Sequence, residues 1–320
     1  METKGSALPP QIPPASLIPV VAPLAGHELP LGASLFSMFL CILFGANAVA
    51  IKISLTGLGV FTTAGIRFGI AAIAIFLWAL CTGRSLAVTK IQFRQLIILA
   101  LFFVVQLTLF YFGQSKTTAS HGTLIANVLP FIVMILAHYF IPGDRINLKK
   151  ISGLVLGFAG VVLLFFDNIA LTGDALQGDL LILLAVLVWG FHVVYIKNVI
   201  EGFHPIQITL YPMSMAAPLF LLAGFFFDGK MISFIDASII KAMLYQTFVT
   251  ASFGLVAWNT MIRRFGATAL HSFVFIMPIS GVFLGVTLLN EPVTANLIGA
   301  IILVVTGLLI VNKKSAGRTG

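Results

Sequence analysis

The stretch from Tyr111 to Gly160 reads YFGQSKTTASHGTLIANVLPFIVMILAHYFIPGDRINLKKISGLVLGFAG. A related stretch begins 147 residues later and reads WNTMIRRFGATALHSFVFIMPISGVFLGVTLLNEPVTANLIGAIILVVTG. At this single offset the equivalent residues are Tyr111 and Trp258, Lys116 and Arg263, Asp144 and Glu291, and Gly160 and Gly307. Repetition at roughly half the chain length is typical of an internally duplicated protein.

A second set of markers supports the duplication. Gly45 and Lys52 recur as Gly190 and Lys197 at an offset of 145 residues. The prolines at the centre of the repeated stretch, Pro130 and Pro278, are one place out of step, which predicts that the two equivalent helices differ slightly in length.

The composition indicates a membrane protein. Of the 320 residues, 59% are hydrophobic and only 9% are charged, and the mean hydropathy of +1.10 excludes a soluble surface. Because a membrane-spanning helix needs about 20 mostly apolar residues, the sequence predicts an all-α integral membrane protein with ten transmembrane helices. The predicted spans are residues 33–53, 59–81, 95–114, 119–140, 149–166, 179–198, 205–227, 239–260, 267–289 and 294–312.

Five spans on each side of the midpoint make the duplication an inverted repeat, because an odd number of spans brings the second half into the membrane from the opposite side. Inverted five-helix repeats are typical of secondary transporters. We expect a disordered, proline-rich cytoplasmic tail over 1–30, a first repeat over 31–167, a second repeat over 178–312 and a basic cytoplasmic tail over 313–320.

The basic residues predict the orientation. With the N-terminus placed in the cytoplasm, thirteen of the 18 lysines and arginines fall on the inner side and four on the outer side. This positive-inside bias places both termini in the cytoplasm. The net charge of +8 therefore reflects orientation and contact with lipid headgroups, and not binding of nucleic acid.

Arg67 is the basic residue predicted to lie well inside a span, between Gly65 and Gly69. A charge facing lipid at that depth costs at least about 2.5–3.5 kcal/mol, so the side chain should face the bundle interior or a water-filled cavity. Two interpretations stay open, namely contact with substrate or a gate, and a structural pair with carbonyls at a helix end.

Other polar, aromatic and proline residues are candidates for a central pathway. Midspan prolines remove a backbone hydrogen bond and bend helices, although ordinary packing would also tolerate them. Tyrosine and tryptophan could line the cavity or anchor the chain at the membrane interface, and each histidine could titrate or simply pack. The pathway candidates are Arg67, Gln106, Tyr111, His121, Asn127, Pro130, His192, Gln246, Trp258, Asn259, His271 and Pro278.

The positions of the acidic residues indicate which charge the substrate has. We expect no carboxylate deep in a span, since the following fall at predicted span ends or in loops: Asp144, Asp167, Asp179, Glu201, Asp228 and Glu291. An interior that is neutral to positive favours a neutral, zwitterionic or anionic metabolite, although aromatic rings alone could still recognise a cation. Without a deep carboxylate, proton coupling would depend on His121, His192 or His271, or be replaced by substrate exchange.

The motifs that the sequence lacks reduce the number of possible functions. The sequence has no phosphate-binding GxxxxGK[ST] motif and no HExxH zinc site, so ATP-driven transport by this chain alone is disfavoured, and we expect no cofactor and no metal. An intramembrane enzyme and a channel-like facilitator stay open as alternatives to a transporter. A pore would be expected to show a filter loop or a ring of like charges.

Two ordered sets of motifs carry a resemblance to a known family. One set is Phe44-Gly45-Ala46-Asn47 through Lys52 into Arg67-Phe68; the other is Pro278 to Glu291-Pro292 to Gly299 and Gly307, with its counterpart Pro130 to Asp144-Arg145 to Gly153 and Gly160. Over about residues 33–312 the chain resembles the drug/metabolite transporter superfamily, with two EamA-type repeats. The resemblance implies alternating access around a central cavity, and export or exchange of small metabolites.

From these observations we expect an integral protein of a bacterial inner membrane that is not an enzyme. Its partners would be membrane lipids and a small-molecule substrate, with protons and a second copy of the chain in a homodimer as further candidates.

Overall fold

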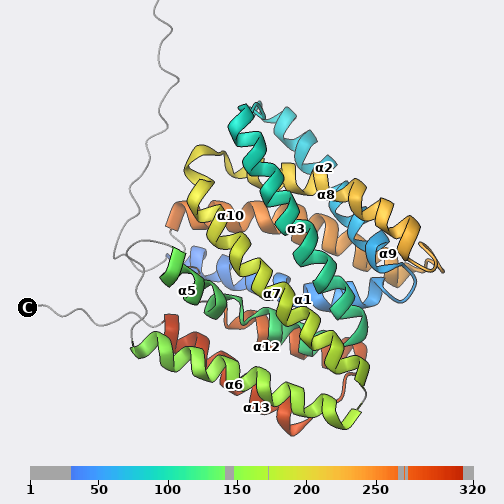
Figure 1. The fold of residues 1–320 in the computed structure, drawn as a ribbon, viewed down its shortest axis with the longest axis vertical. Helices are drawn as coiled ribbons and strands as arrows, with labels where there is room; N and C mark the ends of the chain where they lie inside the picture. Colours follow the sequence, from blue (N-terminus) through green and yellow to red (C-terminus); the bar gives the residue numbers. More distant parts are fainter. Residues whose placement is uncertain (1–29, 141–147, 172, 266–269, 271–272, 313–320) are drawn as a thin grey trace, which may run out of the picture.

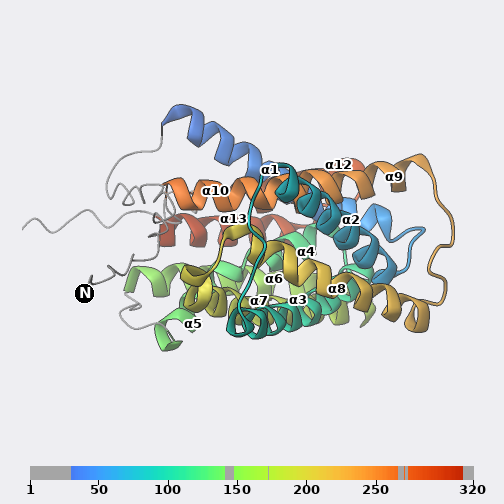
Figure 2. The same ribbon diagram turned by 90° about the horizontal axis from the view of Figure 1, so that it is seen from above.

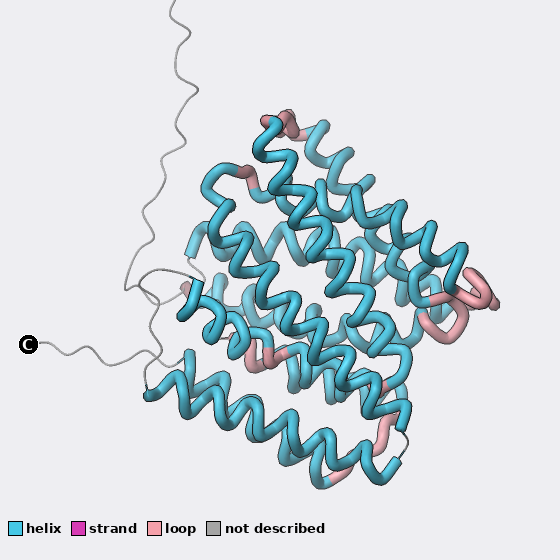
Figure 3. The backbone as a smooth tube through the Cα atoms, in the orientation of Figure 1, coloured by secondary structure: helices cyan, strands magenta, loops and turns pink. Residues whose placement is uncertain are grey.

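The computed structural model describes residues 30–140, 148–171, 173–265, 270 and 273–312. These residues form a bundle of α-helices joined by short loops (Figures 1 and 3). The predicted tails over 1–30 and 313–320 lie outside the described residues, apart from Pro30.

The helices of the first half follow the apolar runs of the sequence. Their bounds are α1 (Leu31–Ser54), α2 (Val60–Cys81), α3 (Lys90–Lys116), α4 (Ala119–Ala126), α5 (Leu129–Phe140) and α6 (Leu148–Leu171). Thr89 begins α3 with a capping box, in which its hydroxyl accepts from the Gln92 backbone N–H while the Gln92 side chain accepts from the Thr89 backbone N–H.

The second half has one helix of unusual geometry. Its elements are α7 (Gly173–Val199), a 3₁₀ turn η1 (Ile200–Gly202), α8 (Pro205–Phe227), α9 (Ala237–Leu244), a π-helical stretch η2 (Tyr245–Gly254), α10 (Leu255–Phe265), α12 (Ile276–Leu289) and α13 (Ala295–Asn312). Because α9, η2 and α10 follow one another without a break, they form one long helix with a widened centre. π-Helical turns are rare and often mark functional sites.

Seven helical stretches of the described chain are long and apolar enough to cross a membrane. Three shorter apolar helices cover Ile151–Leu164, Ile276–Leu289 and Ala295–Val311. Large apolar side chains, such as Phe76, Leu222 and Phe283, remain exposed on the outside of the bundle, where a membrane protein meets lipid.

The predicted span 119–140 is interrupted in the structure. α4 ends at Ala126, the chain turns through Asn127 and Val128, and α5 begins at Leu129. Pro130 therefore lies in the first turn of α5, where its missing N–H is tolerated. Its counterpart Pro278 lies in the first turn of α12, so each proline follows the start of a helix and does not kink a continuous one.

Equivalent helices of the two halves pack against each other in opposite directions. Side chains built on Gly153 and Gly160 of α6 would meet Val311 and Val304 of α13, respectively, so residue numbers rise in one helix as they fall in the other. The same holds for α2 and α8, where Gly65 faces Leu221 and Gly69 faces Ala217. Figure 1 shows α6 and α13 together at one edge of the bundle and α2 with α8 toward the opposite edge.

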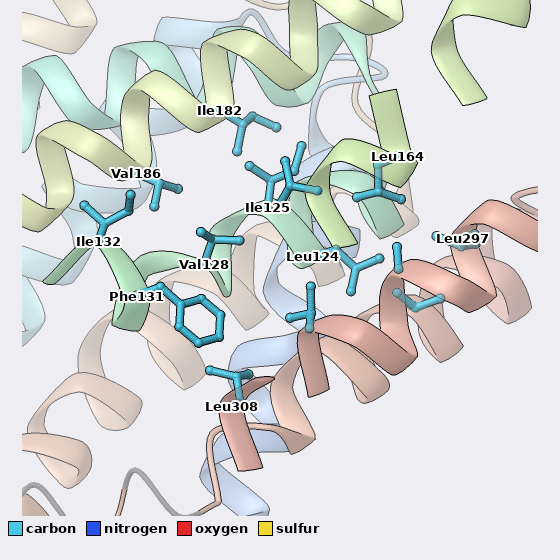
Figure 4. Packing of buried hydrophobic residues seen from close by; sticks show 14 of the residues in the cluster. Leu124, Ile125, Val128, Phe131, Ile132, Leu164, Ile182, Val186, Leu297 and Leu308 are labelled. Carbon is cyan, nitrogen blue, oxygen red and sulfur yellow. The ribbon is translucent and has the colours of Figure 1, made fainter. Parts of the chain in front are cut away.

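Two apolar clusters hold the bundle together. The larger cluster joins the broken helix α4–α5 to α6, α7 and α13 and includes Phe131 (Figure 4). The second cluster joins α2, α3 and α8 around Phe68 and Phe220. Figure 2 shows the bundle from above, with α1 and α12 on the side away from α3 and α7.

Candidate functional site

A buried polar cluster lies where α1, α2, α3 and the π-helical stretch meet. Arg67 of α2 donates from Nη1 to the Tyr111 hydroxyl at 2.9 Å and from Nη2 to Thr250 Oγ1 at 3.2 Å. Tyr111 in turn donates to Gln246 Oε1 at 3.3 Å. Arg67 is only 7% exposed and Gln246 is fully buried, so these hydrogen bonds form away from water.

The cluster continues onto α1 through side-chain amides and hydroxyls. The Thr250 hydroxyl lies 3.0 Å from Asn47 Oδ1, and it also lies 2.8 Å from the Gln246 carbonyl one turn earlier. Gln246 Nε2 donates to Ser54 Oγ at 2.6 Å. The cluster therefore ties α1 and α2 of the first half to the π-helical stretch of the second half. We call Asn47, Ser54, Arg67, Tyr111, Gln246 and Thr250 the arginine cluster.

Among the residues that the structure describes, no carboxylate pairs with the positive charge of Arg67. Across the described residues the ion pairs within 4.0 Å are Lys116 with Asp174 and His121 with Asp179. Arg67 Nε is buried and makes no hydrogen bond within the described parts of the chain. The guanidinium also lies 4.8 Å from the centroid of the Phe68 ring. A buried cation that is satisfied only by neutral groups, and only in part, is a candidate anion-binding group.

Three predicted pathway residues, Arg67, Tyr111 and Gln246, therefore come together in one cluster. Two further candidates, Gln106 and His192, form a separate buried pair between α3 and α7, with 3.1 Å between Gln106 Oε1 and His192 Nδ1.

Asn127 and Trp258 have other partners. Asn127 Nδ2 donates to the Thr123 carbonyl at 2.8 Å, within the same turn of chain. Trp258 packs edge-to-face on Phe44 of α1, with 5.8 Å between ring centroids. His271 and the side chain of Asn259 lie outside the described residues.

Asp179, expected at a span end, is buried between helices. Hydropathy placed the start of that span at residue 179, but α7 begins at Gly173, so Asp179 lies in the second turn of the helix and is fully buried. Its carboxylate is satisfied there by His121 Nδ1 at 2.9 Å and by the Thr117 hydroxyl at 2.6 Å. A carboxylate can enter a buried helix when side chains of neighbouring helices hydrogen-bond both of its oxygens.

Two further carboxylates of the second half contact helix starts of the first half. Asp228 accepts hydrogen bonds from the N–H groups of Phe61 and Thr62, at the start of α2. Glu291 accepts hydrogen bonds from the N–H groups of Ala119 and Ser120, at the start of α4. Negative charge at a helix N-terminus is stabilising because it satisfies free N–H groups and complements the helix dipole.

Sequence reasoning missed Ser54 and Thr250 as members of the arginine cluster. Serine and threonine are common in membrane helices as packing residues, so nothing in the sequence distinguished these two. Asn47 had a weak signal, since it belongs to the motif that precedes Arg67. Within the described ranges, no three His, Cys, Asp or Glu side chains gather closely enough to hold a metal ion.

The apolar helices, the duplicated halves and a buried cationic cluster between them define a membrane transport protein. The chain belongs to the EamA-like transporter family, whose model matches it twice, over residues 31–166 and 176–313. Family and relatives together indicate a transporter and not an enzyme.

Curated relatives cover most of the chain. The "Uncharacterized transporter YoaV" of Bacillus subtilis is 22% identical over 271 residues, which are 84% of this chain and 92% of the relative. A "Probable amino-acid metabolite efflux pump" of Escherichia coli is 26% identical over 290 residues, covering 86% of this chain and 92% of the relative. A protein of known crystal structure has a TM-score of 0.66 at 17% identity, over 88% of this chain and 96% of that chain, which shows the shared fold.

Proposed function

We propose that this protein is a secondary transporter that exports or exchanges a small zwitterionic or anionic metabolite by alternating access. Ten spans would form two inverted repeats in a bacterial inner membrane, with both termini in the cytoplasm. The antiparallel packing of α6 with α13 and of α2 with α8 supports the inverted arrangement. The seven long and three shorter apolar helices support the ten spans.

Arg67 is the observation that carries the choice of substrate. Its guanidinium is buried, its two terminal nitrogens donate to neutral hydroxyls, and its Nε has no hydrogen-bond partner among the described residues. A substrate carboxylate could take up the open donor and compensate the charge in one step, because guanidinium and carboxylate form paired, charge-assisted hydrogen bonds. A permanent cation would instead meet like charge, which costs several kcal/mol in a site of low dielectric.

A metabolite efflux pump among the relatives supports the same class of substrate. Oxygen acceptors for the ammonium group of a zwitterion are present beside Arg67, namely Asn47 Oδ1 and Gln246 Oε1. Neutral metabolites could use the same amides, but they would leave the guanidinium uncompensated. We therefore rank amino acids and small carboxylates first.

The test is a substrate screen on purified protein in liposomes, with amino acids, carboxylates, neutral sugars and quaternary ammonium compounds inside. The expected result is exchange of a carboxylate-bearing compound. Arg67→Lys should weaken it by roughly tenfold or more, because lysine keeps the charge and loses the paired donors, and Arg67→Gln should abolish it.

Arg94→Gln is the matched control, since it removes one arginine from the exposed start of α3 and should leave exchange intact. Equal loss in both variants would show a general effect of net charge. Transport of a permanent cation that survives Arg67→Gln would overturn the proposal.

Exchange kinetics separate a carrier from the channel-like alternative. A carrier that alternates between two states moves labelled substrate faster when unlabelled substrate is present on the opposite side. A facilitator with a continuous pore shows no such acceleration. We expect acceleration of at least severalfold, and a flat response would favour the facilitator.

A further inference from the structure

An apolar pocket opens on the outside of the bundle, between the two halves of the protein. It has a volume of about 200 Å³ and lies between α2 of the first half and the continuous helix α9–η2 of the second half. Of its eleven lining residues, ten are apolar, six of them isoleucine, and the other is Thr247. A water-soluble metabolite would find almost no hydrogen-bond partner on these walls, so the pocket suits an apolar occupant.

The pocket is closed toward the interior of the bundle and open toward lipid. Leu58, Ile239 and Thr247 line it and are buried. Ile70 and Phe248 also line it, but they are exposed on the outside of their helices. The open side is therefore part of the apolar surface of the bundle, where a membrane protein meets the acyl chains of lipids.

The pocket extends inward from the loops at one end of the bundle. At the loop end, the backbone of Leu58 forms a bridge with that of Ile232, which joins the loop before α2 to the loop before α9. Along the second half the lining continues from Ile239 to Phe248, a distance of about 14 Å at the helical rise per residue. That length is roughly half the thickness of the hydrocarbon core of a bilayer. The pocket therefore has the depth of one leaflet, as a phospholipid acyl chain does.

Two lysines lie at the loop end of the pocket. Lys230 is exposed, two residues before Ile232, which lines the pocket. Lys241 is exposed near the start of α9, one turn before the lining residue Leu244. Among the residues that the structure describes, neither lysine forms an ion pair within 4.0 Å. The long apolar stem of a lysine follows the protein surface to the membrane interface, so both ammonium groups can reach a lipid phosphate.

The acidic residues of the same loop are engaged with helix starts. The Asp228 carboxylate accepts from the Thr62 backbone N–H and hydroxyl, at the start of α2. The Asp236 carboxylate accepts from the Ser238 hydroxyl and from the Ile239 backbone N–H, at the start of α9. Because both carboxylates cap helices, the lysines are left to bind a negative group at the mouth of the pocket.

We propose that this pocket binds one acyl chain of an anionic phospholipid, with the lipid phosphate at Lys230 and Lys241. The apolar walls remove the chain from competing contacts, and the two lysines select a negatively charged headgroup. Thr247 lines the pocket and its neighbour Gln246 belongs to the arginine cluster, so the bound lipid packs against the π-helical stretch that contacts Arg67. The inference holds whatever the protein transports.

Photochemical crosslinking in liposomes tests this site without any substrate. The purified protein is placed in phosphatidylcholine vesicles that contain a small fraction of phosphatidylglycerol with a diazirine in its acyl chain. After illumination, mass spectrometry of peptides locates the attached lipid. We expect most of it on α2 and on α9–η2, and severalfold less from a phosphatidylcholine that carries the same diazirine. Lipid attached evenly over the exposed apolar helices would indicate ordinary boundary lipid and overturn the proposal.

A tryptophan at the rim distinguishes the pocket from the rest of the apolar surface. Ile240→Trp adds bulk at an exposed lining position of α9. It should reduce the lipid attached to α2, on the opposite wall, by about fivefold or more, because the indole ring occupies the space of the chain. Ile298→Trp is the matched control, since Ile298 is similarly exposed on α13, which lies at the other edge of the bundle (Figure 1). Equal decreases in both variants, or no decrease with Ile240→Trp, would overturn the assignment.

Lysine variants test the headgroup. Lys230→Gln combined with Lys241→Gln should reduce the preference for the phosphatidylglycerol probe by about tenfold or more, since one lysine near an anionic lipid contributes about fivefold. Lys116→Gln is the matched control, because it removes a lysine that pairs with Asp174 at the end of α3, and it should preserve the preference. An unchanged preference in the double variant would overturn the placement of the phosphate at these lysines.

The same experiment reports on other occupants of the pocket. Crosslinks between two copies of the chain in place of lipid would assign the pocket to a dimer interface and overturn the proposal. Should a variant fail to fold, the distribution of lipid on the wild-type peptides still decides the question. Attachment of lipid is measured without transport, so this proposal and the one tested by the Arg67 variants fail separately.

Discussion

The carboxylate of Asp228 caps the start of α2 by binding Thr62, which lies 166 residues earlier in the chain. Asp228 Oδ2 accepts from the Thr62 backbone N–H at 2.9 Å and from the Thr62 hydroxyl at 2.8 Å. Gly59, at the N-cap position of α2, has no side chain that could do this. The start of α2 is thus completed by the loop after α8, its antiparallel partner from the other half.

Asp228→Ala should lower the thermal unfolding midpoint of the detergent-solubilised protein by several degrees. Loss of a helix cap costs about 0.5–2 kcal/mol, and here it also leaves buried N–H groups without acceptors. Asp236→Ala is the matched control in the same loop, since Asp236 caps α9 locally through the Ile239 N–H at 2.8 Å. Equal decreases of the unfolding midpoint in the two variants would show that the contact between the halves stabilises the protein no more than a local helix cap does.

Gly307→Ala should destabilise the protein far more than Gly69→Ala. A Cβ at position 307 would lie 2.6 Å from the Gly153 carbonyl oxygen of α6, which is backbone and cannot move aside. At position 69 the nearest atom is the Ala217 Cβ at 3.5 Å, an ordinary contact. The free energies of unfolding of the two variants should differ by about 1–3 kcal/mol, the usual cost of overpacking. Unfolding in mild denaturant would measure this difference. Similar midpoints would contradict the close packing of α6 and α13.

Tyr111→Phe and Thr250→Val each remove a hydroxyl that contacts Arg67, and each should weaken substrate binding severalfold. Because both hydroxyls orient one guanidinium, the double variant should lose less than the sum of the single losses, expressed as free energies. The half-saturating substrate concentration is measured for the wild type, both single variants and the double variant, and the four values are compared as a double-mutant cycle. Strict additivity would mean that the two hydroxyls act independently and that Arg67 does not connect them.

Cysteine labelling tests the orientation. In a background without Cys41 and Cys81, Ser233→Cys in the loop after α8 should react with an impermeant thiol reagent in intact cells. Gly202→Cys, in the turn before α8, should react only after the membrane is opened. The positive-inside bias of the sequence is the reason for this expectation. Labelling in the reverse pattern would show that the protein has the opposite orientation in the membrane.

Much of the fold was predictable because the thickness of the bilayer sets the length of an apolar helix that spans it. The apolar runs 59–81 and 205–227 correspond closely to α2 and α8. The interruption of 119–140 at Asn127 and the π-helical turns of Tyr245–Gly254 were not predictable. Both depend on which backbone carbonyl accepts each N–H, and hydropathy carries no information about that choice.

The arginine cluster was predictable in part. A charge such as Arg67 within an apolar run has to face the interior, so its burial followed from solvation energy. Its partners could not be derived, because Thr250 lies 183 residues away and reaches Arg67 only through the packing of two halves. The burial of Asp179 could not be derived for the same reason, since it depends on His121 from another helix.

The π-helical stretch makes the two halves of this duplicated chain unequal. The sequence offset between the halves is 145 residues at Gly45 and Gly190 but 147 at Tyr111 and Trp258, so the second copy carries extra residues before Trp258. A π-helix holds more residues per turn than the α-helical α3, its counterpart, and can absorb insertions inside the membrane. Because this stretch carries Gln246 and Thr250, the two halves differ in backbone geometry where they meet Arg67, and a substrate bound there would contact an asymmetric pair of surfaces.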